Sequence, residues 1–191
     1  MRKSFLESLV VLSSRGLLIL SVLVSATGGF LSLSAQEQPA KTVDRWEPFR
    51  FLVGEWVGEG DGQPGQGSGG STFTLDLNEK ILTRKSYNNI PATKDRPAVN
   101  HEDLVITYID PQKQVRAIYW DNEGNTINYA VEVGADKRTI TLLSDVQLSA
   151  PRFRFTYNKV AADTLKVQFE MAPPGKPEAF TTYVTGTMHR K

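Results

Sequence analysis

The chain has 191 residues, a net charge of +1 and 40% hydrophobic residues, which suits one packed domain and is too apolar for a disordered chain. It contains no cysteine, and this excludes a disulfide framework, a thiolate nucleophile, a zinc finger and an iron–sulfur site. The near-zero charge argues against a nucleic-acid-binding protein, which normally presents a concentrated basic face. We therefore expect a globular protein with no nucleic-acid partner.

Residues 1–35 have the pattern of an export signal. Basic residues at the start precede an apolar run over residues 17–24, and small residues at Ala26 and Ala35 offer two cleavage positions. An uncleaved membrane anchor is the alternative, because the apolar stretch and its C-terminal flank carry no charge. We predict a signal peptide over residues 1–35, a periplasmic or secreted location, and no stable membrane insertion after cleavage.

Residues 36–45 are polar and are predicted to form a linker. The next segment, residues 46–53, is dense in aromatic and apolar side chains, and we expect a short helical turn that covers one end of the domain. Residues 46–191 are then predicted to form a single β-barrel domain.

The rest of the chain alternates apolar and polar residues with period two, which is typical of half-buried strands. Short turn sequences such as Asp110-Pro111 and 121–124 separate these segments. Short connections force neighbouring strands to run antiparallel, and closure of the sheet removes its two raw edges. We therefore predict an all-β, up-and-down barrel of about ten strands, with a two-sheet sandwich as the alternative. The expected strands are residues 54–60, 72–77, 81–89, 104–109, 115–120, 127–133, 138–144, 153–157, 165–171 and 180–189.

Eight of the fifteen glycines fall between Gly54 and Gly70. In a strand, Gly54, Trp56 and Gly58 share one face, and a large indole beside residues without side chains suits a crowded interior position. Residues 63–70 are predicted to form a flexible loop. No Gly-Lys-Ser/Thr follows, so the loop is not a phosphate cradle.

This pattern of an apolar entry segment, Gly-x-Trp-x-Gly-x-Gly-x-Gly and about ten meandering strands resembles the nitrobindin-like group of small β-barrels, which are related to fatty-acid-binding proteins and lipocalins, the calycins. The resemblance covers residues 46–191 and implies the barrel. In that group the motif continues into Tyr-Pro, where this chain has Pro64-Gly65, and Tyr183 stands at about the position of the haem-ligating histidine. A tyrosinate can ligate haem iron, so the resemblance leaves a haem barrel that handles nitric oxide or peroxynitrite as an alternative.

Few residues indicate chemistry. His101 precedes a predicted strand, and we expect an ordinary histidine at the end of a loop rather than a general base. His189 lies near the end of the last strand, where a solvated role is expected. Two histidines 88 positions apart, without a cysteine cluster, are a poor zinc signature, and we predict neither a metal site nor a catalytic residue.

We interpret the sequence as an exported barrel that binds a small apolar or amphipathic molecule in its interior. Arg84, if it points inward, would hold a ligand carboxylate, and Tyr108 and Tyr119 would join other aromatic residues along the interior. The residues that we predict to bind the ligand are Trp56, Arg84, Trp120, Tyr129 and Tyr183. A filled barrel that presents Glu55, Val57 and Glu59, or the loop at residues 63–70, to a protein partner is a further alternative. No cofactor is predicted apart from haem in the alternative above.

Overall fold

The structure is a computed structural model that describes residues 43–59 and 67–191. The predicted signal peptide, and the linker up to residue 42, lie outside the described residues. Within the described part of the chain, no helix has the length and hydropathy needed to cross a membrane.

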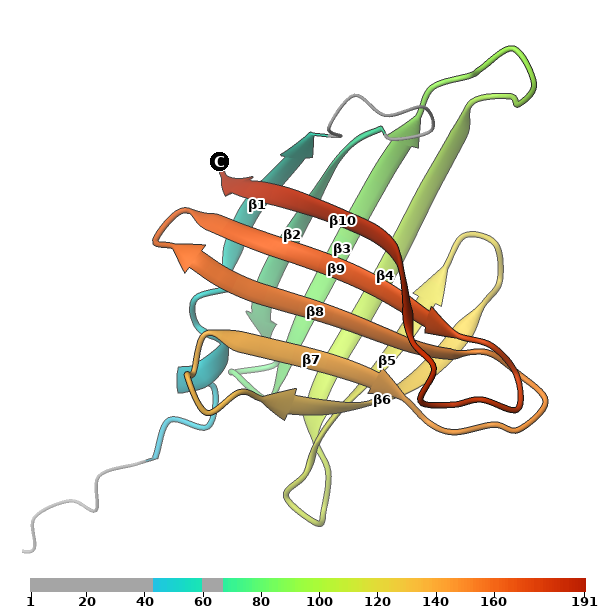
Figure 1. The fold of residues 1–191 in the computed structure, drawn as a ribbon. Coiled ribbons are helices and arrows are strands. Elements are labelled where there is room, and N and C mark those ends of the chain that lie inside the picture. Colours follow the sequence, from blue (N-terminus) through green and yellow to red (C-terminus); the bar gives the residue numbers. More distant parts are fainter. Residues whose placement is uncertain (1–42, 60–66) are drawn as a thin grey trace, which may run out of the picture. The chain divides into compact units, whose positions relative to one another are not determined.

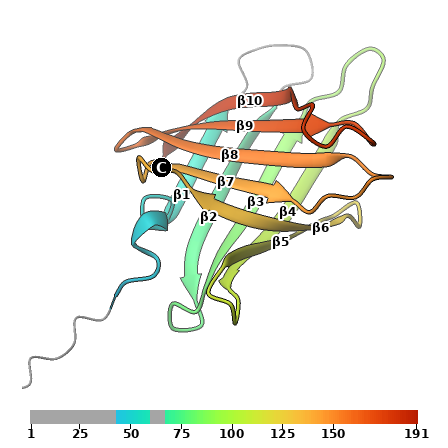
Figure 2. The same cartoon turned by 60° about the horizontal axis from the view of Figure 1, so that its bottom comes forward.

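Ten antiparallel strands form one closed barrel, as the sequence predicts (Figures 1 and 2). Each strand pairs with its neighbours in the chain, and β1 pairs with β10 to close the sheet. Val57 lies opposite His189 at this junction. The strands are β1 (Gly54–Glu59), β2 (Ser68–Asp76), β3 (Ile81–Ile90), β4 (Val99–Ile109), β5 (Val115–Asp121), β6 (Thr126–Val133), β7 (Thr139–Ser144), β8 (Arg152–Ala161), β9 (Thr164–Ala172) and β10 (Thr181–Arg190).

Three strand boundaries differ from the prediction by four or five residues, and one of them is the end of β8, which runs to Ala161 instead of residue 157. β2 begins at Ser68, so residues 68–70, which were expected in a loop, form strand pairs with β1 and β3. A Cβ atom at Gly69 would lie 2.6 Å from the carbonyl oxygen of Tyr87, so glycine permits this close pairing of β2 with β3. β4 begins at Val99, five residues before the predicted start, and therefore includes His101.

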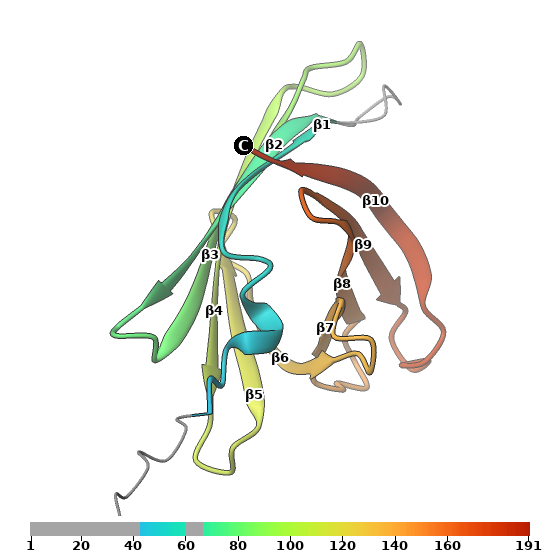
Figure 3. The ribbon, with the colours of Figure 1, turned by 90° about the vertical axis from the view of Figure 1, so that its left-hand side faces the viewer.

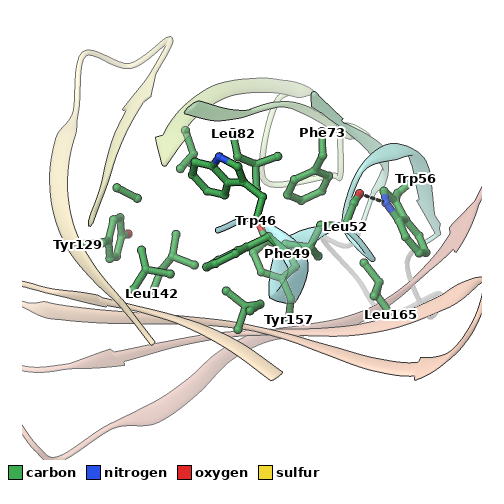
Figure 4. Close-up of a cluster of buried hydrophobic side chains, with 14 of the residues drawn as sticks. Trp46, Phe49, Leu52, Trp56, Phe73, Leu82, Tyr129, Leu142, Tyr157 and Leu165 are labelled. Atoms are coloured by element: carbon green, nitrogen blue, oxygen red, sulfur yellow. Dashed lines mark hydrogen bonds between the residues drawn. The ribbon is translucent and has the colours of Figure 1, made fainter. Parts of the chain in front are cut away.

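A 3-10 turn, η1 (Glu47–Phe49), covers one end of the barrel, in agreement with the predicted helical turn. Trp46, Phe49 and Leu52 are at most 3% exposed and pack among the inward side chains of the strands (Figure 4). The indole N–H of Trp46 donates to the carbonyl of Glu79, 2.7 Å away, in the turn between β2 and β3. We call this end of the barrel the sealed end.

Trp56 joins the entry segment to the junction of β1 and β10. Its side chain is 1% exposed, as predicted for an interior position, and its indole N–H donates to the carbonyl of Leu52 at 2.6 Å (Figure 4). The guanidinium of Arg190, from β10, lies 4.3 Å from the centre of the indole ring. The same guanidinium donates to the carbonyls of Phe51 and Val53. One tryptophan and one arginine thus tie together the first strand, the last strand and the turn before them.

Candidate functional site

The half of the barrel next to the sealed end is filled by its own side chains. The cavity that remains there has a volume of about 20 Å³ and lies among Phe49, Leu82, Arg84, Tyr157 and their neighbours. A volume of this size holds one water molecule. A small-molecule ligand therefore has no room in this half of the interior.

The other half of the barrel, which we call the open half, is lined differently. Phe153 and Phe155 on β8 and Phe169 on β9 face inward by register, yet they remain half-buried, whereas Tyr157, two positions further along β8, is 3% exposed. Because inward side chains become more exposed in this direction, solvent reaches them from the end opposite η1. The interior of the barrel is thus accessible to solvent from that end.

Aromatic rings form one wall of the open half. Phe153 stacks on Phe169 with ring centroids 5.8 Å apart, and Phe155 lies 6.1 Å from Phe169. Tyr183 packs edge-on against Phe169, with ring centroids 6.0 Å apart. It lies on β10 at the position where the register with β9 shifts. We call Phe153, Phe155, Phe169 and Tyr183 the aromatic wall.

Polar side chains from β4 and β5 form a second wall. The Nε2 atom of His101 lies 3.1 Å from the hydroxyl of Tyr119, and that hydroxyl donates to a carboxylate oxygen of Asp121 at 3.0 Å. Burial and the hydrogen bond to Asp121 raise the pKa of Tyr119, so the phenol stays neutral. We call His101, Asp103, Tyr119 and Asp121 the polar wall.

Arg84 is buried next to the polar wall and contacts its member Asp103. It is 7% exposed, and its two terminal nitrogens donate to the hydroxyl of Tyr157 and to a carboxylate oxygen of Asp103. Burial opposes the charge of Arg84, but Tyr157 and Asp103 outweigh burial and raise its pKa, so the guanidinium remains protonated. The guanidinium has five N–H donors, so these two contacts do not use all of them, and its buried Nε has no hydrogen-bond partner among the described residues. The proposed role of Arg84 in ligand binding stays a prediction.

The other residues predicted to bind ligand fall in different places. Trp56 and Tyr129 face the interior but are 1% and 4% exposed, so both belong to the packed core. Burial raises the pKa of Tyr129. Tyr183 lies at the open end and is 69% exposed. The structure thus brings Tyr183 to the open half and places Trp56 and Tyr129 in the packed core.

The prediction that Trp120 and Tyr108 line the interior is wrong. Trp120 pairs with Leu104 and Tyr108 with Arg116, and all four point to the outside of the barrel. Their neighbours in the chain point inward instead, as Tyr119 shows. Since successive side chains of a strand alternate between faces, an error of one position in facing reverses the assignment.

Sequence reasoning missed Asp103, Asp121 and the three phenylalanines of the aromatic wall as candidate site residues. The alternation over residues 153–157 and 165–171 was visible and identified these phenylalanines as one face of a strand. The sequence did not show which end of each strand meets η1, so buried core and accessible wall were indistinguishable.

His101, Asp121 and Glu123 bring possible metal-ligating atoms within 4.8 Å of one another. The carboxylate of Asp121, however, already accepts hydrogen bonds from Tyr119, from the side chain of Asn125 and from the backbone amides of Glu123 and Asn125. These bonds shape the turn between β5 and β6 and lower the pKa of Asp121 against the effect of burial. The hydrogen bonds of the turn explain why these side chains lie close together, and we assign no metal to them.

A shallow groove of about 480 Å³ lies outside the sealed end. Its basic side chains have partners within the protein: Lys137 lies 3.8 Å from Glu47, and the guanidinium of Arg138 donates to the carbonyls of Lys159 and Val160. Lys159 itself lies over the ring of Phe51. These contacts hold the β6–β7 and β8–β9 turns to the segment around η1, so the groove has a structural role.

Comparison with known proteins supports the fold alone. No protein-family model matches the chain, and no curated protein matches its sequence. Among solved structures, the chain is similar to Rv2717c from M. tuberculosis, with a TM-score of 0.51 and 14% identity over 76% of this chain and 96% of that one. The two chains share the fold of a small antiparallel β-barrel. The predicted resemblance to small barrels of this kind is confirmed at the level of fold.

Proposed function

We propose that the protein binds a small amphipathic or apolar molecule in the open half of its barrel, and that it does so after export, as residues 1–35 indicate. The observation that carries the proposal is the half-buried state of Phe153, Phe155 and Phe169, which face inward by register beside a filled core. Large aromatic side chains that stay accessible inside a barrel offer apolar surface to a ligand.

The two walls indicate how such a ligand would lie. The aromatic wall would bury the apolar part of the molecule, since each phenylalanine contributes contact area without a polar atom to satisfy. The polar wall, through His101, Asp103 and Tyr119, would take hydrogen bonds from its polar part. Binding is passive, with burial giving affinity and the polar wall giving orientation.

Binding of the neutral fluorescent probe N-phenyl-1-naphthylamine to the full chain tests the proposal. We expect Phe169→Ala to weaken binding by about 10-fold or more, because a buried phenylalanine contributes about 1.5–3 kcal/mol. The matched control is Gln168→Ala, since the adjacent Gln168 points outward and donates to Thr182. Wild-type protein without saturable probe binding, or equal loss in both variants, would contradict an interior site.

Haem, the cofactor in the alternative hypothesis of a haem barrel, does not fit the described residues. The cavity of the sealed half is far too small for a macrocycle. His189 points outward beside Thr164, the Nε2 atom of His101 is bonded to Tyr119, and Tyr183 is 69% exposed. Both ring nitrogens of His101 thus have protein partners, His189 faces away from the interior, and Tyr183 lies largely in solvent.

We accordingly expect titration of the full chain with haemin to give no sharp Soret band that depends on Tyr183. Absorbance spectra of the wild type and of Tyr183→Phe, recorded side by side, provide the measurement. A sharp band in the wild type that disappears in Tyr183→Phe would restore the haem barrel and displace the proposal above.

A further inference from the structure

Two aspartates lie opposite each other inside the open half of the barrel. Asp103 on β4 and Asp121 on β5 are direct strand partners, and they face inward, as does the pair of Val105 and Tyr119 two positions further along. Like charges at directly opposed positions of neighbouring strands destabilise a sheet. A pair that breaks this rule inside a barrel indicates a place where positive charge is held.

Arg84 offsets the charge of one aspartate and leaves the other uncompensated. Its guanidinium donates to Oδ1 of Asp103. The carboxylate of Asp121 accepts from Tyr119, from the side chain of Asn125 and from backbone amides, which are all neutral donors. Burial raises the pKa of Tyr119, and the charges of both aspartates raise it further, so the phenol between them lies in a negative potential.

The other inward positions of the open half supply no balancing cation. In the described strands they carry uncharged side chains, apart from His101. The Nδ1 atom of His101 lies 3.4 Å from Glu123, which stands at the mouth of the barrel. Even when His101 is protonated, Asp103, Asp121 and Glu123 outnumber it and Arg84.

The loops around the mouth do not change this balance. Their exposed charges have both signs, and in the described residues they comprise Lys94, Asp95, Arg96, Glu123, Asp145, Lys176 and Glu178. Asp145 and Glu178 pair with Arg116 and Arg152. Solvent and salt screen charges at such positions, whereas the interior pair is screened much less.

Asp103 has an oxygen atom that a ligand can use. Its Oδ2 lies 3.9 Å from Nε2 of His101, which is too far for a hydrogen bond. The side chain keeps 11% of its surface exposed. An ammonium group brings three N–H donors and a positive charge, so it would satisfy Oδ2 and offset the charge of Asp121 together.

The aromatic wall lies across the interior from the two aspartates. β8 and β9 face β4 and β5 on the other side of the barrel (Figure 3). Arg84 spans the gap, since its guanidinium also lies 5.4 Å from the centre of the Phe155 ring. The faces of phenylalanine rings attract cations as well as apolar groups. An apolar body along the aromatic wall thus fits with a cationic group at Asp103.

We propose that the ligand of the open half is a cationic amphiphile whose ammonium group donates to Asp103, opposite Asp121. This inference rests on the interior site proposed above and names the chemistry of its ligand. An anionic head would instead approach two carboxylates, beside a guanidinium whose charge Asp103 already offsets. The cavity that Arg84 lines in the sealed half, about 20 Å³, is too small to take a carboxylate.

Competition with N-phenyl-1-naphthylamine for the full chain at pH 7 tests the charge of the ligand. Decylamine, 1-decanol and decanoate have the same number of carbon atoms and carry a positive, a neutral and a negative head. We expect decylamine to displace the probe at a concentration at least about 10-fold lower than 1-decanol, and decanoate to be the weakest competitor. The same order should persist at about 0.5 M salt, where attraction by the exposed loops is screened.

Two variants locate the effect. Asp103→Asn removes the charge and keeps an acceptor oxygen, so decylamine and 1-decanol should then compete within about threefold of each other. The matched control is Glu102→Gln, which removes the same charge from the neighbouring, exposed and outward position. It should keep the wild-type ratio within about twofold. Far-UV circular dichroism establishes folding, and each comparison is a ratio within one protein. If Asp103→Asn does not fold, the wild-type series at the two salt concentrations decides.

The outcomes separate this inference from the interior site itself. Decanoate that competes as well as decylamine, or an undiminished preference for decylamine in folded Asp103→Asn, overturns the cationic ligand and leaves the interior site standing. Wild-type protein without saturable probe binding overturns both.

Discussion

Arg84→Met is expected to lower the free energy of unfolding by about 3–5 kcal/mol, because it leaves the carboxylate of Asp103 without its charge partner in a site shielded from water. The side chains of Arg84 and Asp103 are 9% and 11% exposed, so solvent screening does not relieve the loss. Tyr157 also loses its hydrogen bond to the guanidinium. Urea denaturation followed by circular dichroism measures the difference.

The pH dependence of this variant has a definite sign. Without Arg84, no cation offsets the charge of the Asp103 carboxylate in a poorly solvated site, whereas the protonated carboxyl carries no charge. Ionisation of this group as the pH rises therefore costs the variant stability. The deficit relative to the wild type should therefore be smaller at pH 4 than at pH 7.

Two further variants test whether the loss in Arg84→Met comes from the unpaired carboxylate of Asp103. Arg84→Met combined with Asp103→Leu should recover most of the loss, since an apolar pair leaves no buried charge. Arg50→Met removes exposed ion pairs with Asp44 and Glu79 and should lower stability far less than Arg84→Met, because solvent screens exposed charges. A double variant as unstable as Arg84→Met alone would show that packing, rather than the uncompensated carboxylate, dominates.

Trp56→Ala should lower the free energy of unfolding by about 3–5 kcal/mol, the range for large-to-small substitutions of buried aromatic residues. The indole is 1% exposed and contacts both ends of the strand series, through Leu52 on one side and Arg190 on the other. Its removal opens a cavity at the junction of β1 and β10. Thermal melting and urea denaturation provide the measurement.

The neighbouring residue supplies the control for Trp56. Val57 lies on the same strand, points outward and is 36% exposed, so Val57→Ala should change stability by less than about 1 kcal/mol. Trp56→Phe should lie between the two, since it keeps an aromatic ring and loses the hydrogen bond to Leu52. Equal destabilisation by Val57→Ala and Trp56→Ala would contradict the interior placement of the indole.

The fold was predictable because the signals that carry it are local. Alternation along residues 72–77 or 165–171 marks strands, and turns such as Asp110-Pro111 are too short for anything except antiparallel neighbours. Closure followed from the cost of two unpaired edges, and the pairing of Val57 with His189 confirms it. The glycines around Trp56 marked an interior position in the same way.

The candidate site depends on relations that no single segment contains. Arg84 meets Tyr157 across 73 positions of the chain, and nothing in either segment indicates the other. Trp120 and Tyr119 have the same aromatic character, and only the register with β4 decides that Tyr119 faces inward. The position of η1 determines which phenylalanines are core and which are accessible, and that position depends on the assembled barrel.

The pairing of β1 with β10 also determines when the molecule can be completed. Trp56 and Arg190 become neighbours only when nearly the whole domain has been synthesised, so the most distant partners in the sequence form the last seam. Contacts between residues so far apart in the sequence slow folding, because the chain loses conformational entropy when β1 and β10 come together, before their pairing stabilises the barrel. Until β10 has been synthesised, the hydrogen-bonding groups along one side of β1 have no protein partner and can pair with the edge of another incomplete chain.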